Sequence, residues 1–287
     1  MQKHEHEIPN GSKLYFGKTA SKKRHLERLA SELLENNGFS EIITPFFSYH
    51  QTNAISEQKL LRFSDEVNAS LALRADSTVD VVRIITRRLK DETTKKWFYI
   101  QPVFSYPSIE TYQIGAEILD STELASCVNT ASSLLQKLEI NAILQVSNMK
   151  IPHLLCELLG FDMSVFELGR IELIFAKNLN WLDKLATISS LADIKALQNN
   201  IPSELKEPLN ELSALANEAN FNGKIAFAPL YYSKMRYYDK LFFRFLCANK
   251  ILCSGGEYSI DNRNCVGFGA FSDNIICLLY TSPSPRD

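Results

Sequence analysis

The chain has 287 residues, 45% of them hydrophobic, which is enough for one large domain or two small ones with a packed core. Its formal net charge of −2 at pH 7 excludes the overall basic field expected of a nucleic-acid-binding protein. No run approaches the ~18 apolar residues of a membrane span, and the first residues lack the apolar core of a signal peptide, so we expect a cytoplasmic protein without membrane or nucleic-acid partners.

The six cysteines are scattered without a C-x-x-C pair. In a cytoplasmic chain this favours reduced, mostly buried thiols over a disulfide framework or a metal site. His4 and His6 could ligate a metal, but both lie in a polar leader. We therefore expect a solvated leader there and no bound metal.

The first part of the chain alternates between helical and extended patterns. Leucines at helical spacing predict an amphipathic helix over 19–37. A strand interrupted by Pro45 follows in "FSEIITPFFSYH", since proline cannot donate to a β-ladder. "LALR" predicts a short strand, and Ser77 with Asp80 three residues later resembles a capping box that opens the next helix.

The middle of the chain predicts two paired strands, then a helix, a strand and a helical region. "KWFYIQPVFSY" and "TYQIGAEIL" are β-rich runs joined by a short link, which indicates an antiparallel pair. A helix is expected from about Asp120 to Leu138, and "INAILQVS" is typical of a strand. Residues 149–221 carry several helical patterns and are expected to form a helical insertion.

Strand patterns return after the insertion, in "KIAFAPLYYS", "MRYYDKLFFRFLC" and "CVGFGAF", with a turn expected at Gly255 and Gly256. Strands at both ends with helices between them predict an α+β fold with a mostly antiparallel sheet. Residues 1–148 and 222–279 would form this core. Residues 280–287 have two prolines and no periodicity, which is typical of a frayed tail. Because they resemble vector or adapter read-through, we expect that they are not native to the protein.

Several segments, in order over residues 10–276, resemble those of histidyl-tRNA synthetases. "GFSEIITPFF" resembles the first class II motif, which ends at a proline in the dimer interface, and "LRADSTVDVVR" resembles LRPEGT. "FYIQPVFSY" and "YQIGAEIL" resemble the second motif and its following strand. "MRYYDKLFF", "GGEYS" and "CVGFGAFSDNI" resemble LDYYNGTVF, GGRYD and the third motif. The resemblance implies a class II aminoacyl-tRNA synthetase-like antiparallel sheet flanked by helices.

The resemblance includes the positions that bind the amino acid in the synthetases. Asp76 stands where a glutamate takes the ammonium group of the ligand, and Thr78 matches a neighbouring contact. Gln113 and Glu117 lie four apart, on one face of the predicted strand, and match the strand that faces histidine. The aromatic wall is matched by Tyr237, Tyr238 and Tyr258. Ordinary structural roles are the alternatives: a capping turn, a surface carboxylate and aromatic packing.

The nucleotide side departs from the synthetase pattern. Ser105 and Pro107 stand where the second motif has an arginine and a glutamate. Ser233 and Asn274 stand in place of two further arginines. Removing even one fixed group that stabilises developing charge typically costs ~10²–10³ in rate, so the sequence predicts that this protein is not an enzyme.

A basic run lies on the helix predicted after Asp76. "RIITRRLK" contains four cationic residues: Arg83, Arg87, Arg88 and Lys90. A solvated face is the expected role for such a run. A partner-binding or phosphate-binding face is the alternative.

An amino-acid pocket without the nucleotide-binding arginines resembles the regulatory subunits of ATP phosphoribosyltransferase, synthetase paralogues that lack the anticodon-binding domain. The resemblance implies a non-catalytic, cofactor-free subunit that binds L-histidine and the short-form catalytic subunit, as a dimer within a hetero-octamer, and feedback-regulates the first step of histidine biosynthesis. The alternatives are a degenerate histidyl-tRNA synthetase core or amino-acid-activating paralogue, and a structural or tRNA-binding paralogue without a ligand.

Overall fold

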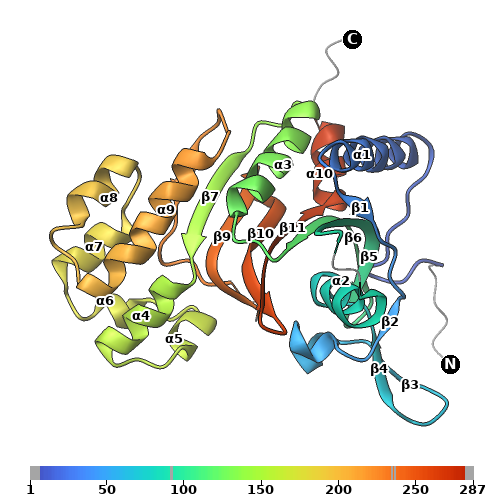
Figure 1. The fold of residues 1–287 in the computed structure, drawn as a ribbon, viewed down its shortest axis with the longest axis horizontal. Coiled ribbons are helices and arrows are strands. Elements are labelled where there is room, and N and C mark those ends of the chain that lie inside the picture. The colour runs from blue at the N-terminus through green and yellow to red at the C-terminus, as the bar shows by residue number, and fades with distance from the viewer. Residues whose placement is uncertain (1–6, 91–92, 234, 236, 282–287) are drawn as a thin grey trace. The chain divides into compact units, whose positions relative to one another are not determined.

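The structure, a computed structural model, describes residues 7–90, 93–233, 235 and 237–281. The expectation for His4 and His6 lies outside the described residues. Contacts within the chain define two compact units (Figure 1). Unit 1 contains Met1–Asp120 and Gly267–Asp287, and unit 2 contains Ser121–Val266.

Unit 1 is built around a long hairpin. Two strands pair antiparallel, as predicted, and a third pairs parallel at their edge: β5 (Lys96–Ser105), β6 (Ile109–Leu119) and β1 (Ser40–Glu41). Tyr99 lies opposite Gly115, and Gln101 opposite Gln113. Because paired residues point to the same side of a sheet, these polar side chains share one face, and buried residues such as Phe98 lie on the other.

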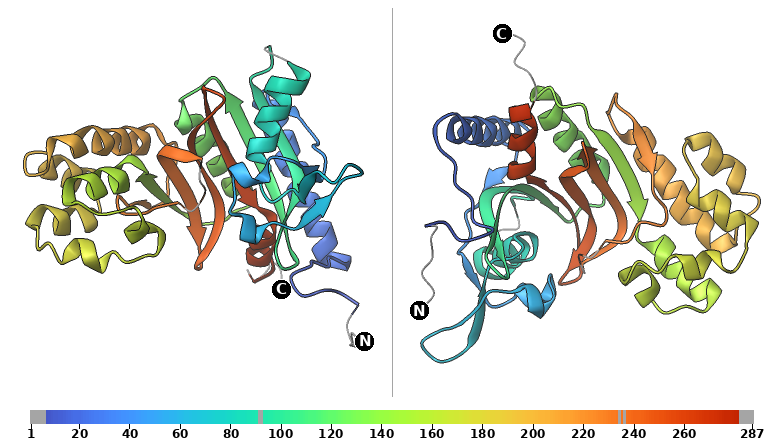
Figure 2. Two further views of the ribbon diagram at one scale, coloured as in Figure 1. Left: turned by 90° about the horizontal axis from the view of Figure 1, so that it is seen from below. Right: turned by 180° about the vertical axis from the view of Figure 1, so that it is seen from behind.

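Two helices of unit 1 lie side by side (Figures 1 and 2): α1 (Gly17–Asn36) and α10 (Ser272–Thr281). Both contact β6, and α1 buries Leu26, Ala30 and Leu34 at helical spacing, which confirms the amphipathic helix predicted over 19–37. Helix α10 includes residues 280 and 281 of the predicted tail, whose assignment as non-native stays a prediction. Residues 282–287 lie outside the described residues.

A small second sheet of unit 1 leads into helix α2. Its elements are β2 (Phe47–Ser48), the 3₁₀ turns η1 (Gln51–Asn53) and η2 (Glu57–Lys59), β3 (Arg62–Ser64), β4 (Ser70–Leu73), α2 (Thr78–Arg83) and the π-helical continuation η3 (Ile84–Leu89). β4, predicted from "LALR", pairs antiparallel with both β2 and β3. Since α2 contacts β6, the joint between β4 and α2 lies against the central hairpin.

Four strands of unit 2 are hydrogen-bonded in the order β10-β9-β7-β8. Its strands are β7 (Ile143–Asn148), β8 (Ile225–Phe227), β9 (Tyr238–Cys247) and β10 (Lys250–Ile260). The pairs are antiparallel except for β7 with β8, which is parallel. Strand β11 (Arg263–Phe271) begins in unit 2 and ends in unit 1. The predicted α+β class with a mostly antiparallel sheet is confirmed.

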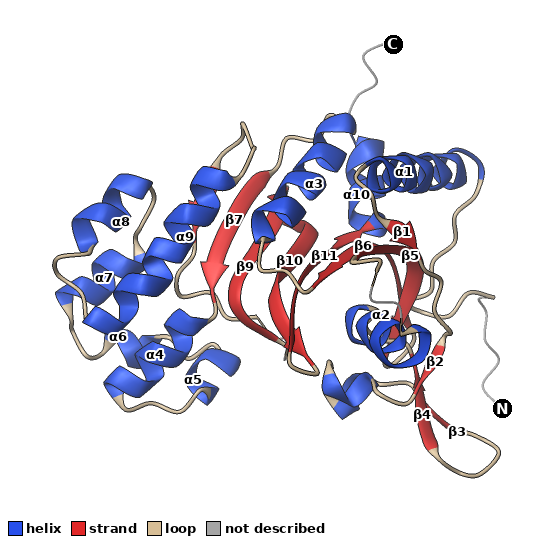
Figure 3. Ribbon diagram, viewed as in Figure 1, coloured by secondary structure: helices blue, strands red, loops and turns tan. Residues whose placement is uncertain are grey.

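The other elements of unit 2 are helical: α3 (Leu124–Lys137), α4 (Lys150–Leu159), α5 (Ser164–Glu167), α6 (Glu172–Phe175), α7 (Asn180–Ala186), α8 (Leu191–Leu197), η4 (Ser203–Leu205) and α9 (Lys206–Glu218). Residues 149–221 contain helices and no strand, as their pattern predicts (Figure 3). Their assignment as an insertion into a core domain stays a prediction.

The turn predicted at Gly255 and Gly256 is wrong. Both glycines lie inside β10, and the chain turns instead at Ala248 and Asn249, whose φ angles are 46° and 63°. Gly256 serves a close approach: a Cβ there would lie 2.8 Å from the ring of Tyr238. A glycine pair therefore marked tight packing in a strand rather than a change of direction.

The cysteines agree with the expectation of reduced, mostly buried thiols. Four of the six are buried: Cys127, Cys156, Cys253 and Cys265. Within the described part of the chain, no cluster of three or more His, Cys, Asp or Glu residues could hold a metal ion. None of the described helices has the length and hydropathy required to cross a membrane.

Candidate functional site

Arg74 fixes the joint between β4 and α2. Its fully buried guanidinium donates five hydrogen bonds: from Nη1 to Thr44 O (2.9 Å), Thr44 Oγ1 (3.0 Å) and Pro45 O (3.0 Å), and from Nε and Nη2 to Pro102 O (3.1 and 2.7 Å). Burial lowers the pKa of Arg74 to about 10, so the group remains charged at neutral pH. Arg74 is therefore a structural brace between three chain segments.

Gln51, on the short η1 turn, clamps the same joint from the other side. Its Oε1 accepts hydrogen bonds from the backbone N–H groups of Ala75 (2.7 Å) and Asp76 (2.8 Å). Its Nε2 donates to Asp76 O (3.0 Å) and to Asp80 Oδ2 (2.6 Å). Burial raises the pKa of Asp80, and the hydrogen bonds from Gln51 and Ser48 oppose that rise. No sequence pattern indicated this role of Gln51.

The predicted capping box is wrong. Ser77 precedes α2 in helical rather than extended conformation (φ −91°, ψ −30°), and its side chain forms no capping hydrogen bond. Its buried hydroxyl instead accepts a hydrogen bond from Gln101 Nε2 at 3.0 Å. Asp76 takes the capping position, because its Oδ1 accepts from Val79 N at 3.3 Å. Asp76 thus has the capping role that was considered as the structural alternative to ligand binding.

A chain of hydroxyl and carboxylate groups joins α2 to the hairpin. The Tyr99 hydroxyl donates to Glu117 Oε1 at 3.2 Å, and it lies 3.4 Å from Thr78 Oγ1. Thr78, Tyr99 and Glu117 are all buried. The structure therefore connects Thr78 and Glu117 through Tyr99. Asp76 lies two residues before Thr78, at the start of α2. Gln113, half-buried, lies on the same strand face as Glu117.

Two glycines make room for this cluster. A Cβ at Gly115 would overlap the Tyr99 ring, and one at Gly267 would overlap the Glu117 carboxylate. Sequence reasoning missed Tyr99 and both glycines. For Tyr99 and Gly115 the signal was the register of the hairpin, which places them opposite each other.

The predicted aromatic residues form a cluster of their own in unit 2. The ring of Tyr237 lies 4.5 Å from that of Tyr238 and 5.5 Å from that of Tyr258, between ring centroids. Tyr238 and Tyr258 are partners in the register of β9 and β10, with their rings 6.2 Å apart at 80°. The three tyrosines thus contact one another, in a different unit from Asp76 and Glu117.

Comparisons with known proteins place this arrangement in a family. The family model described as histidyl-tRNA synthetase matches residues 15–274. The chain is 46% identical over 275 residues to the ATP phosphoribosyltransferase regulatory subunit of Wolinella succinogenes, covering 95% of each chain. It is 38% identical over 279 residues to that of Helicobacter hepaticus, covering 96% of this chain and 99% of the relative. The chain belongs to the ATP phosphoribosyltransferase regulatory subunits, within the histidyl-tRNA synthetase family.

Solved structures agree on the fold. A regulatory subunit/histidyl-tRNA synthetase from Bacillus halodurans superimposes with a TM-score of 0.84 at 20% identity, covering 97% of this chain and 84% of the other. Histidyl-tRNA synthetase from Nostoc superimposes with a TM-score of 0.79 at 16% identity, covering 97% and 76%. The class II aminoacyl-tRNA synthetase-like fold inferred from the sequence is confirmed.

The positions that differ from the synthetase motifs lie in both units of this regulatory-subunit homologue. Ser105 ends β5, and Pro107 follows a cis peptide bond in the turn to β6. Asn274 lies in α10. Ser233 is buried in unit 2, where its Oγ accepts a hydrogen bond from Met235 N at 3.2 Å.

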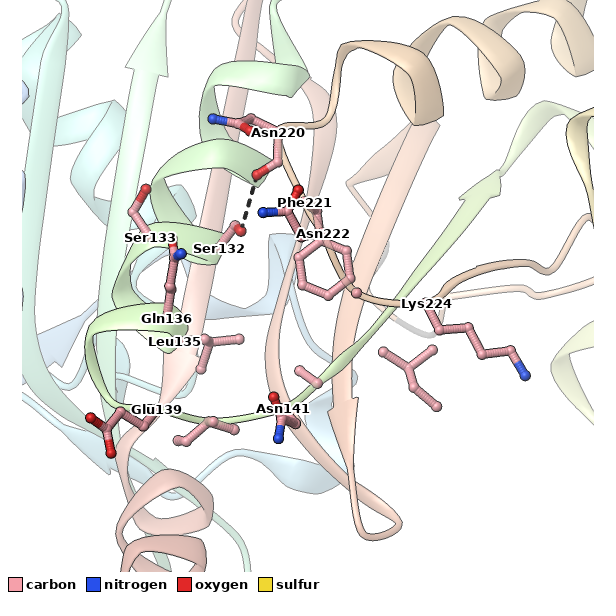
Figure 4. A pocket seen from close by; sticks show the side chains of 14 residues that line it. Ser132, Ser133, Leu135, Gln136, Glu139, Asn141, Asn220, Phe221, Asn222 and Lys224 are labelled. Atoms are coloured by element: carbon pink, nitrogen blue, oxygen red, sulfur yellow. Dashed lines mark hydrogen bonds between the residues drawn. The ribbon is translucent and has the colours of Figure 1, made fainter.

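A larger hollow of this regulatory-subunit homologue lies within unit 2 (Figure 4). It measures about 870 Å³ and lies between the end of α3 and the segment that follows α9. Amides and hydroxyls dominate its wall, where Ser132 Oγ donates to Asn220 O at 3.4 Å. The residues predicted to bind histidine do not line it.

Proposed function

We propose that this chain is the non-catalytic regulatory subunit of ATP phosphoribosyltransferase and that it binds L-histidine for allosteric feedback regulation. The observation that carries the proposal is the 46% identity to a regulatory subunit over 95% of both chains. The proposed partner is the short-form catalytic subunit, in the cytoplasm. In this assembly the chain forms a dimer within a hetero-octamer.

The cluster in unit 1 is chemically suited to a free amino acid. The ammonium group of histidine needs a carboxylate, which Asp76 and Glu117 supply, and its imidazole needs hydrogen-bonding groups such as those of Gln113 and Thr78. The Tyr99 hydroxyl holds the Glu117 carboxylate from one side. Such preorganisation favours binding because less side-chain freedom is lost when the ligand arrives.

We also assign the three tyrosines of unit 2 to histidine binding. Their rings offer apolar faces and their hydroxyls offer hydrogen bonds, which suits an imidazole ligand. The Tyr258 ring is almost fully buried, whereas Tyr237 and Tyr238 are half-buried. A Tyr238→Phe variant tests this assignment separately from the carboxylates, because it removes one hydroxyl and keeps the ring.

Exposed apolar side chains near β2 support self-association. Ile43 is 80% exposed and Phe47 is 57% exposed, and the Phe47 and Phe63 rings lie 5.7 Å apart. Grouped apolar side chains on a surface are typical of protein interfaces. We assign this face of unit 1 to the dimer.

The absence of adenylate chemistry follows, in this proposal, from the residues at the nucleotide positions. Ser105, Ser233 and Asn274 have no positive charge to stabilise a developing phosphate charge. A degenerate synthetase would instead retain ATP-dependent pyrophosphate exchange. That assay separates the two functions.

Calorimetric titration of the full chain with L-histidine tests the proposal directly. We expect saturable binding that is independent of ATP and magnesium and changes when the catalytic subunit is added, by a coupling of about 1–3 kcal/mol. Glu117→Gln should weaken binding by roughly 10–100-fold, because a hydrogen bond to a charged group contributes about 1.5–3 kcal/mol. Glu66→Gln, at an exposed position of unit 1, is the matched control and should bind normally.

Each part of the proposal has its own contradicting result. Undiminished binding by folded Glu117→Gln would exclude the assigned site. A wild-type chain that ignores histidine would exclude the ligand. Histidine-dependent pyrophosphate exchange would exclude a non-catalytic subunit, and failure to change the activity of the catalytic subunit would exclude the regulatory role.

A further inference from the structure

A basic pocket in unit 1 lies apart from the proposed histidine-binding residues. It has a volume of about 250 Å³ and lies between β2 and the helical segment formed by α2 and η3. Its charged and titratable lining residues are Arg83, Arg87, Arg88, His50, Tyr49 and Asp80. Three guanidinium groups thus share a small hollow with one carboxylate.

The helical winding gathers the arginines on one side. Residues Ile84–Leu89 are π-helical, and the Lys90 N–H donates to Ile85 O at 2.9 Å, five residues back. In a π-helix, residues five apart are neighbours along the axis, so Arg88 follows Arg83 on the same side. In an α-helix the same two residues would point about 140° apart, from 3.6 residues per turn. The rare winding therefore concentrates positive charge at the pocket.

The Arg83 side chain has unused hydrogen-bonding capacity. Its Nε atom is buried and has no hydrogen-bond partner among the described residues. Neither Arg83 nor Arg88 forms an ion pair with a described carboxylate. A buried guanidinium donor without an acceptor is unfavourable, and an oxyanion in the pocket would satisfy it.

Asp80 does not neutralise this pocket through a direct ion pair. Its Oδ1 accepts a hydrogen bond from Ser48 Oγ at 2.7 Å, and its Oδ2 accepts one from Gln51 Nε2 at 2.6 Å. Both oxygens are therefore engaged by the joint between β4 and α2. The Tyr49 hydroxyl donates to Asp65 Oδ2 at 2.6 Å, which ties the ring at the rim to the loop after β3.

We propose that this pocket binds a phosphate group, either inorganic or carried by a small metabolite. The planar guanidinium groups match the paired oxygens of a phosphate and form charge-assisted hydrogen bonds with them. The volume suits one or two phosphoryl groups rather than a whole nucleotide. None of the residues proposed to bind histidine lines this pocket.

Calorimetric titration of the full chain tests the site. The probes are inorganic phosphate, pyrophosphate and glycerol 3-phosphate, each at an ionic strength matched with sodium chloride. We expect at least one of them to bind saturably, with a tenfold or greater loss of affinity in Arg83→Gln and in Arg88→Gln. Arg28→Gln, on the exposed side of α1, removes the same charge elsewhere in unit 1 and should bind as the wild type does.

The comparison among probes identifies the source of the phosphate. Tighter binding of glycerol 3-phosphate than of inorganic phosphate assigns the pocket to a phosphorylated metabolite, and the reverse order assigns it to the free ion. Arg88→Lys keeps the charge but not the planar fork, so it should recover only part of the affinity. Because Arg88 is exposed, its variants test the site even if Arg83→Gln unfolds.

Two results would overturn the proposal. One is a wild-type chain that binds none of the three probes. The other is an equal loss of affinity in Arg28→Gln and Arg88→Gln, which would reduce the effect to overall charge. Histidine titrations of the same variants should be unchanged, which keeps this test separate from that of the proposed function.

Discussion

Two buried glutamates, one in each unit, are held in different ways. Glu117 of unit 1 is 0% exposed, bonded to Tyr99 and enclosed by Gly267. Glu257 of unit 2 is 8% exposed, and its carboxylate has no hydrogen-bond or ion-pair partner among the described residues. Burial raises the pKa of Glu257, an effect that the charge of Lys240 opposes. The two carboxylates are therefore both buried, but within the described part of the chain only that of Glu117 has a hydrogen bond to another side chain that offsets the cost of burial.

The largest effect on stability is expected from the removal of Arg74, the brace of unit 1. Arg74→Met should reduce the free energy of unfolding by about 3–5 kcal/mol, because it removes a buried charged donor from acceptors on Thr44, Pro45 and Pro102. Urea denaturation followed by circular dichroism measures the loss. Histidine binding should be lost together with the fold of the joint.

Arg244→Met in unit 2 is the matched control. Arg244 is half-buried, its Nη2 donates to Gln145 Oε1 at 2.8 Å, and its guanidinium lies 3.8 Å from the centroid of the Tyr231 ring. Fewer buried acceptors depend on it, so the loss should be about 1–2 kcal/mol. Equal losses in the two variants would contradict the role of Arg74 as a brace.

A smaller effect is expected from filling the space beside Glu117. In Gly267→Ala the new methyl group would overlap the Glu117 carboxylate and lie 2.9 Å from the backbone oxygen of Ala116. We expect a loss of about 1–3 kcal/mol in urea denaturation, together with weaker histidine binding. Gly269→Ala, in the same strand, is the control, since no atom lies within 4 Å of its added methyl group. If the two variants behave alike, Gly267 does not shape the site.

Some features of unit 1 could be predicted from the sequence. The shared face of Gln113 and Glu117 followed from the two-residue period of a strand, which is local information. The same holds for the helix that buries Leu26 and Leu34. Local patterns determine which side of an element a residue occupies, so these predictions needed no tertiary contact.

The missed features depend on distant parts of the chain. Arg74 bonds residues about 30 positions away, and Gln51 reaches Asp76 across 25 positions. Ser77 bonds Gln101 rather than capping its own helix, because the backbone conformation at the joint is set by those long-range contacts. A short motif such as S-x-x-D carries no information about which distant donor will compete for the hydroxyl.

The smallest predicted effect concerns Glu257, the buried glutamate of unit 2. Glu257→Gln should raise the melting temperature at pH 7–8 by roughly 1–3 °C, the shift that corresponds to less than 1 kcal/mol in a chain of this size. Because its folded-state pKa lies above the ordinary value of 4.5, the folded protein binds the proton more tightly than the unfolded chain does. Wild-type stability therefore falls as pH rises through that raised pKa, and the amide removes this dependence.

The pH profile separates this effect from a general change in packing. Near pH 4, below the raised pKa, the wild-type carboxyl is largely protonated in the folded state, so the advantage of Glu257→Gln should shrink. Glu218→Gln, at an exposed position of α9, should show no such pH-dependent gain. A gain for Glu257→Gln that is equal at pH 4 and pH 8 would attribute the effect to packing rather than to charge. Loss of stability at both values would mean that the Glu257 carboxylate is a bonded part of unit 2, and the contrast with Glu117 would then disappear.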